Sequence, residues 1–121
     1  MKRRRPFYVW LSLPLVAGIS ALAAPISSAA SPTPLTGAAL YQEACAYCHG
    51  SSGQGGVRER APRLWGKNNT VQGGAYGTPA ALSQFIKRYM PLNPVNGINP
   101  GSLTRDQAKS LARYILSKQH P

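Results

Sequence analysis

The sequence has few residues that ligate metals or form cross-links. Its 121 residues include two cysteines, two histidines and three acidic residues, and they contain no internal repeat. Two cysteines allow one intrachain disulfide at most, and a bridge between Cys45 and Cys48 would close a very short loop and restrain the unfolded chain little. The length is enough for one small domain. A chain this short, and rich in glycine and proline, has too few side chains to build a stable core by itself. We therefore expect a group other than side chains to fill its centre.

Basic residues, by contrast, are in large excess. Fourteen lysines and arginines give the chain a formal net charge of +11. Four of them lie in the first five residues, so the remainder carries +7 by subtraction. These other charges are spread along the chain and form no block interleaved with aromatic residues, which argues against nucleic-acid binding. They predict a surface that attracts an acidic protein partner or anionic lipid, or one that is simply solvated.

Residues 1–30 have the layout of a secretory signal peptide. A basic head, Met1–Arg5, precedes a mostly apolar run, Phe7–Ala24, and the small-residue stretches "ALAA" and "SSAA" offer cleavage sites. An uncleaved membrane anchor is the alternative, although the run is at the short end of the roughly 17–25 residues that a spanning helix needs. Arg4, Arg5 and Phe7 also have a loose similarity to the twin-arginine export signal.

The rest of the chain predicts an all-α domain with about three main helices and long loops. Residues 31–35, "SPTPL", are expected to form a linker, and the domain occupies residues 36–121. The first helix is expected to run from Thr36, as N-cap, through His49. The last begins at Thr104, where Gln107 completes a capping box. The intervening sequence contains no convincing strand.

The second helix has the clearest signals. Thr78 can cap it, Pro79 suits its first position, and apolar residues recur at helical spacing from Leu82 to Tyr89. It is expected to stop at Met90, because a proline disfavours the helical conformation of the preceding residue and cannot donate to the helical ladder. Met90 therefore lies at a break in the chain.

The stretch "CAYCHG" carries the chemistry. On a helix, Cys45, Cys48 and His49 occupy positions i, i+3 and i+4, so their side chains leave by one face. A flat macrocycle against that face can be bonded at its edge by both sulfurs and at its central metal by the imidazole. This is the C-x-x-C-H attachment motif of c-type haem.

Three other interpretations of the motif remain open. A thioredoxin-like dithiol uses C-x-x-C but belongs in a βαβ context that this sequence lacks. A zinc site would need His120, near the C-terminus, as its fourth ligand. A plain disulfide between the two cysteines is the third.

A haem iron held by His49 has a second axial position, and its occupant separates electron transfer from ligand chemistry. Met90 is the only methionine after the N-terminal segment, and the proline-induced break can hold its thioether at a fixed point. The alternatives are that Met90 is core filler, that His120 is the ligand, or that the position is open or otherwise filled.

The segment from about Leu35 to Lys118 resembles a class I cytochrome c. The similarity rests on features spread along the segment: Gly37 and Tyr41 on the first helix, "CAYCHG", "APRLWG", "YMP", and Tyr114 on the final helix. In the families that carry the C-x-x-C-H motif, haem is joined outside the cytoplasm to an unfolded chain. This agrees with a secretory signal and argues against the twin-arginine route.

The resemblance also implies roles for individual residues. Cys45 and Cys48 would form the thioethers, with His49 as proximal and Met90 as distal ligand of the iron. The carbonyl of Pro62 would accept a hydrogen bond from the His49 ring and raise its basicity. Leu64 would pack on the haem, and the first and last helices would cross closely at Gly37. Pro62 and Leu64 can equally be read as a loop proline and a core leucine.

A narrower similarity links "FIKRYMPLNP" and "LTRDQAKSLARYI" to the cytochrome domains of thiosulfate dehydrogenases and their small electron-accepting partners. Catalytic subunits of that family carry more than one haem and ligate the active-site iron with a cysteine. This chain has a single motif and no third cysteine, which argues for a carrier or accessory subunit.

The sequence therefore predicts a periplasmic, non-enzymatic electron carrier with one covalent haem c that cycles between ferrous and ferric states. Its expected partners are redox proteins with an acidic docking surface. The alternatives are a haem-bearing subunit of a sulfur-oxidising enzyme, a peroxidase, and a membrane-tethered carrier that retains Met1.

Overall fold

The structure is a computed structural model that describes Gly18 and residues 35–119. The described residues form four helices and no strand: α1 (Gly37–Ala44), α2 (Ala46–His49), α3 (Pro79–Tyr89) and α4 (Arg105–Ser117). The predicted all-α class is confirmed. Apart from Gly18 and Leu35, the expected signal peptide and linker lie outside the described residues, as does His120. No described helix has the length and hydrophobicity needed to cross a membrane.

The prediction of one continuous helix from Thr36 through His49 is wrong in one respect. The structure has two helices there, α1 and α2, separated at Cys45. Thr36 caps α1 as expected, its side chain accepting from the Ala39 N–H. At Cys45, however, φ is −119° and ψ is −39°, far enough from helical values to interrupt the regular repeat. The backbone N–H of His49 still donates to the Cys45 carbonyl at 2.9 Å. Cys45 and His49 thus keep the one-turn relationship that the motif needs.

Helix α3 begins and ends where its sequence signals predict. The Thr78 hydroxyl accepts a hydrogen bond from the Ala81 N–H, and Pro79 occupies the first turn. Met90 is the C-terminal cap with extended backbone angles, φ −105° and ψ 146°, as the following proline requires. The break at Met90 is confirmed.

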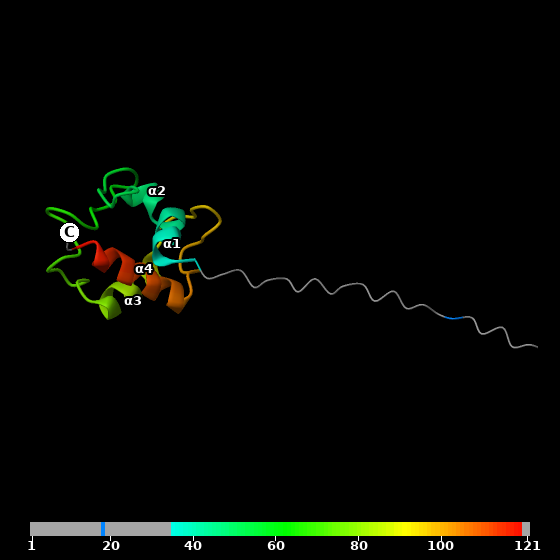
Figure 1. Cartoon of the computed structure of the whole chain (residues 1–121). Helices are drawn as coiled ribbons and strands as arrows, with labels where there is room; N and C mark the ends of the chain where they lie inside the picture. Colours follow the sequence, from blue (N-terminus) through cyan, green and yellow to red (C-terminus); the bar gives the residue numbers. More distant parts are fainter. Residues whose placement is uncertain (1–17, 19–34, 120–121) are drawn as a thin grey trace, which may run out of the picture. The chain divides into compact units, whose positions relative to one another are not determined.

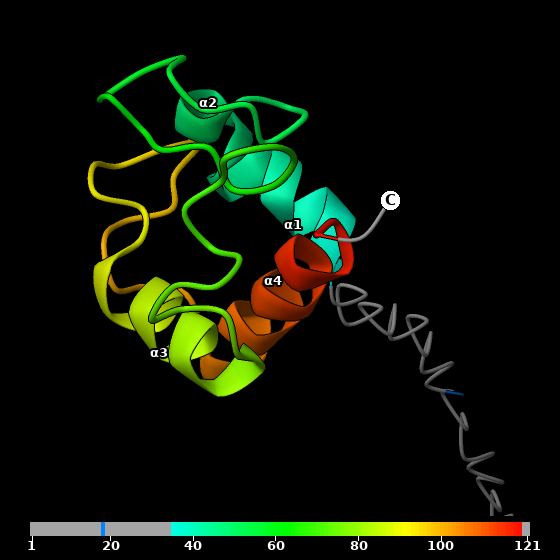
Figure 2. The same ribbon diagram turned by 90° about the vertical axis from the view of Figure 1, so that its left-hand side faces the viewer.

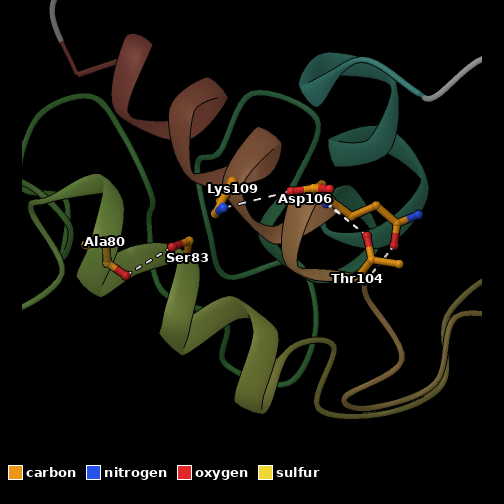
Figure 3. Close-up of polar contacts among 6 residues, drawn as sticks. Ala80, Ser83, Thr104, Asp106 and Lys109 are labelled. Atoms are coloured by element: carbon orange, nitrogen blue, oxygen red, sulfur yellow. Dashed lines mark hydrogen bonds and ion pairs between the residues drawn. The ribbon is translucent and has the colours of Figure 1, made fainter.

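Helix α4 starts with the predicted capping box. The Thr104 side chain accepts from the Gln107 N–H, and the Gln107 side chain accepts from the Thr104 N–H. Figure 3 shows these contacts, together with the weak ion pair between Lys109 and Asp106 at 3.9 Å. Satisfying two otherwise unpaired N–H groups fixes the first turn of the helix.

Helix α4 lies between α1 and α3, and both pack against it (Figures 1 and 2). The buried core is formed by side chains of these three helices and of the loops, among them Leu40, Tyr41, Val71, Leu82, Ile86, Leu103, Ala108, Leu111, Ala112 and Ile115. The close crossing of α1 and α4 at Gly37 is confirmed. A Cβ atom on Gly37 would lie 2.9 Å from Cβ of Tyr114.

Candidate functional site

The six residues singled out from the sequence meet in one cavity. Its volume is about 430 Å³, within the range of roughly 300–1,000 Å³ that small-molecule and cofactor sites occupy. Its walls include Cys45, Cys48, His49, Pro62, Leu64 and Met90. These residues come from α2 and its N-cap, from the loop that follows α2, and from the end of α3. The fold therefore brings together groups that are far apart in the sequence.

The remaining walls are mostly apolar. Helices α3 and α4 contribute Leu82, Phe85, Ile86 and Ile115, and the loop before α3 contributes Val71. Apolar walls exclude water, so a charge that forms inside the cavity is stabilised by a few fixed groups rather than by solvent. The cavity suits a large apolar ligand that is held by a few polar or metal-binding contacts.

His49 is the most strongly constrained polar group in the wall. Its side chain is buried, and its Nδ1 atom lies 2.9 Å from the carbonyl oxygen of Pro62. A carbonyl oxygen can only accept, so Nδ1 carries the proton and a neutral ring keeps its lone pair on Nε2. Burial lowers the pKa of His49, although the hydrogen bond to Pro62 opposes this shift. Burial is the larger of the two effects, so the imidazole is neutral and can ligate a metal through Nε2.

The two cysteines are not joined to each other, and their surroundings disfavour the thiolate form of each. Burial, with a smaller contribution from the nearby Cys48, raises the pKa of Cys45 to about 12. The pKa of Cys48 is also raised, by burial and by the charge of Glu59. A redox-active dithiol works through a thiolate of lowered pKa, so this environment is opposite to the one that the dithiol interpretation needs. The described residues contain no cluster of three or more His, Cys, Asp or Glu that could hold a metal ion, and His120, which the zinc interpretation needs as a ligand, lies outside them.

Met90 is placed by the end of α3 and by the loop that follows. Its own N–H donates to the Ile86 carbonyl at 3.0 Å, which anchors it to the last helical turn. The following loop is tied back at two points. Lys87 Nζ donates to the Gly101 carbonyl at 2.7 Å, and Asn96 Nδ2 donates to the Glu43 carbonyl at 2.9 Å. These contacts limit how far the thioether can move.

Sequence reasoning missed three residues at this site. Glu59 and Arg60 line the cavity and have positive φ angles of 53° and 52°, a conformation uncommon for residues other than glycine. Gln119 is buried, and its side chain donates to the carbonyl of Leu64, which lines the cavity. No pattern in the sequence marks these three residues.

Comparison with known proteins identifies the family. The profile described as "Cytochrome C oxidase, cbb3-type, subunit III" matches residues 32–115, more than half of the chain. The chain belongs to this family of c-type cytochromes. Electron transfer is its general activity, and covalently bound haem c is its cofactor. The class I cytochrome resemblance seen in the sequence is thereby confirmed.

Three proteins similar to this chain are thiosulfate dehydrogenases. Thiosulfate dehydrogenase from Allochromatium vinosum is 33% identical over 94 residues, which cover 74% of this chain and 33% of the relative. Thiosulfate dehydrogenase from Stutzerimonas stutzeri is 36% identical over 88 residues, 70% of this chain and 27% of the relative. The solved structure of thiosulfate dehydrogenase (TsdBA) from Marichromatium purpuratum, "as isolated" form, matches 67% of this chain and 17% of that chain, with a TM-score of 0.55 and 34% identity.

This cytochrome thus spans only about a third or less of the curated relatives that it matches. The residues around its cavity nevertheless fit haem c. Two thiols lie at one wall, a neutral imidazole and a thioether lie in the same cavity, and the rest of the lining is largely apolar. This donor set is the one that covalent haem with two axial protein ligands requires.

Proposed function

We propose that this cytochrome is a periplasmic electron carrier that holds one haem c through Cys45 and Cys48, with His49 and Met90 as axial ligands. The observation that carries the proposal is that His49 and Met90, contributed by different helices, both line the same apolar cavity. Haem c supplies one-electron chemistry at an iron that is either ferrous or ferric. An iron with two protein ligands changes its coordination little on reduction, as an electron carrier requires.

Each residue has a distinct part in this proposal. His49 presents Nε2 because Pro62 holds the proton on Nδ1, and this hydrogen bond raises the basicity of the ring. The thioether of Met90 favours the ferrous state and raises the reduction potential. Leu64 is buried and forms part of the apolar wall that keeps water out.

The optical spectrum of the exported, haem-loaded protein tests the ligand assignment. We expect the oxidised form to show the weak red charge-transfer band of methionine bound to ferric haem. The band should vanish in Met90→Ala. The control is Leu92→Ala, which removes another cavity-lining side chain close to Met90 but no ligand. A c-type spectrum that lacks the band in the wild type would refute ligation by Met90 and favour an enzyme with an open iron site.

The partner is proposed to be a redox protein that docks beside Cys48. Here the Arg58 guanidinium lies over the ring of Tyr47 at 4.2 Å, and the backbone N–H of Arg58 donates to the Cys48 carbonyl at 3.2 Å. Tyr47 and Val57 are each about half exposed, at 48% and 49%. This combination of exposed apolar surface and one basic group suits an acidic partner that binds briefly.

A second function is favoured by the relatives themselves. Because they are thiosulfate dehydrogenases and this chain matches only part of their length, it can instead serve as a haem-bearing subunit of a sulfur-oxidising enzyme. Mixing thiosulfate with the oxidised protein alone tests this. Reduction of the haem by thiosulfate, as fast as an enzyme would turn thiosulfate over, would favour an enzymatic site. A carrier is expected to show no reduction.

The periplasmic location is part of the same proposal and rests on the signal-peptide pattern of residues 1–30. Sequencing the N-terminus of the exported protein tests it. A mature chain that begins between Ala24 and Ser31 supports cleavage and release. A chain that retains its first residues supports a tethered carrier.

A further inference from the structure

Gln119 makes a side-chain hydrogen bond from the C-terminal end of the described chain to a residue that lines the haem cavity. Its side chain is buried, with 9% of its surface exposed. Nε2 donates to the carbonyl of Leu64 at 2.8 Å and to the carbonyl of Ile115 at 3.1 Å. Both partners can only accept, so the orientation of the amide is fixed. Leu64 and Ile115 both line the cavity, and Gln119 therefore links two of its walls.

Three carbonyl groups in the segment 61–64 accept hydrogen bonds from α2 and from the neighbouring loops. The Ala61 carbonyl accepts from Gly56 at 2.7 Å, the Pro62 carbonyl from His49 at 2.9 Å, and the Arg63 carbonyl from Thr70 at 3.1 Å. The Leu64 carbonyl is held differently, because its donor is Gln119 in the distant C-terminal part of the chain. Among the hydrogen bonds of the described residues, only this one joins the backbone of the segment to the residues that follow α4.

The amide of Gln119 is retained although it is imperfectly satisfied. Its Oε1 atom is buried and has no hydrogen-bond partner among the described residues. An unpaired buried oxygen costs free energy, so an apolar side chain would be favoured here unless the amide met another need. That need is the Leu64 carbonyl, which an apolar side chain would leave without its donor.

We propose that Gln119 is a positioning residue, which holds the segment 61–64 against α4 and so keeps the Pro62 carbonyl aligned with the ring of His49. The proposal rests on His49 being the proximal haem ligand, as proposed above. Losing the Leu64 contact removes one of the bonds that hold the segment, two residues from Pro62, and so weakens the hydrogen bond from His49 to Pro62. A weaker hydrogen bond makes the His49 ring a poorer electron donor. A poorer donor stabilises ferric iron less, so the reduction potential rises.

The test compares Gln119→Met and Gln119→Ala with Gln107→Ala in the haem-loaded protein. Gln119→Met keeps the length of the side chain and removes its donor, whereas Gln107→Ala removes the capping box at the other end of α4. The measurements are the midpoint potential, the melting temperature and the exchange rate of the His49 ring N–H in the reduced protein. We expect both Gln119 variants to raise the potential and accelerate the exchange several-fold, and Gln107→Ala to change only the melting temperature.

Two outcomes would overturn the inference. In the first, the Gln119 variants lower the melting temperature but, like Gln107→Ala, leave the midpoint potential and the ring N–H exchange rate unchanged. This result would assign Gln119 to stability alone. In the second, neither Gln119 variant retains haem whereas Gln107→Ala does, which assigns it to folding in general. A wild-type spectrum without two axial protein ligands would instead contradict the proposed function, so the two failures are distinguishable.

Discussion

Gly37 of α1 lies directly against Ser110 of α4: a Cβ atom at Gly37 would be 2.5 Å from the Ser110 carbonyl oxygen. That atom belongs to helical backbone and cannot rotate away. Gly37→Ala is therefore expected to push the two helices apart and to lower the free energy of unfolding by about 1–3 kcal/mol. Chemical denaturation of the haem-loaded protein measures the loss.

The control for this prediction is Ala38→Gly, at the exposed neighbouring position. It should cost no more than about 1 kcal/mol, because it changes only helix propensity. If propensity alone governed both sites, Gly37→Ala would stabilise the protein. A stabilised Gly37→Ala variant would contradict the close crossing.

Tyr41→Phe tests the contact between α1 and the end of the haem motif. The buried Tyr41 hydroxyl donates to the Gly50 carbonyl at 2.8 Å, and this carbonyl also accepts from the Gly53 N–H. Because the carbonyl keeps one partner, the variant is expected to lose only about 0.5–1.5 kcal/mol at neutral pH. The ring contacts with Trp65 and Tyr114 remain.

The same variant should alter the pH dependence of stability. Burial raises the pKa of Tyr41 above its usual value near 10. Above pH 10 the unfolded chain loses the phenol proton while the folded protein keeps it, so the wild type loses stability as the pH rises. Tyr41→Phe lacks this loss, and the stability gap between the two proteins should narrow above pH 10. A constant gap would show that the phenol titrates normally.

The haem-free chain is expected to be largely unfolded, because haem would fill the cavity of about 430 Å³ at the centre of so small a core. Thiol alkylation of the haem-free protein measures this as a function of pH. An unfolded chain should react with an apparent pKa near the ordinary thiol value of about 8.5. Protection of Cys45 up to a pKa of about 12 would instead show that the fold forms without haem.

Circular dichroism of Cys45→Ala/Cys48→Ala provides an independent check, since that variant cannot attach haem covalently. It should show no cooperative thermal transition. A sharp melting curve would contradict the prediction.

Charge reversal separates the proposed docking face from the general basic surface. Arg58→Glu and Arg113→Glu change the net charge equally, but only Arg58 adjoins Cys48. Arg113 is an exposed residue of α4. Arg58→Glu is expected to slow electron transfer with an acidic redox protein about tenfold at low salt and to weaken its dependence on ionic strength. Equal effects of the two variants would place docking elsewhere.

The haem motif, the helix caps and the break at Met90 could all be predicted from the sequence. Each depends on neighbouring residues: Thr78 bonds within its own first turn, and Pro91 acts on the residue before it. The interruption at Cys45 could not be predicted, because the stretch from Thr36 to His49 carries no proline or other local signal for it.

The sequence by itself determined the helical class, the likeness to c-type cytochromes and the identity of the groups that can hold haem. Only the tertiary structure decided that His49 and Met90 share one cavity, that Pro62 holds the His49 ring, and that Gln119 reaches Leu64. Local signals act over one helical turn, whereas these contacts join loops and helices whose approach depends on packing of the whole core.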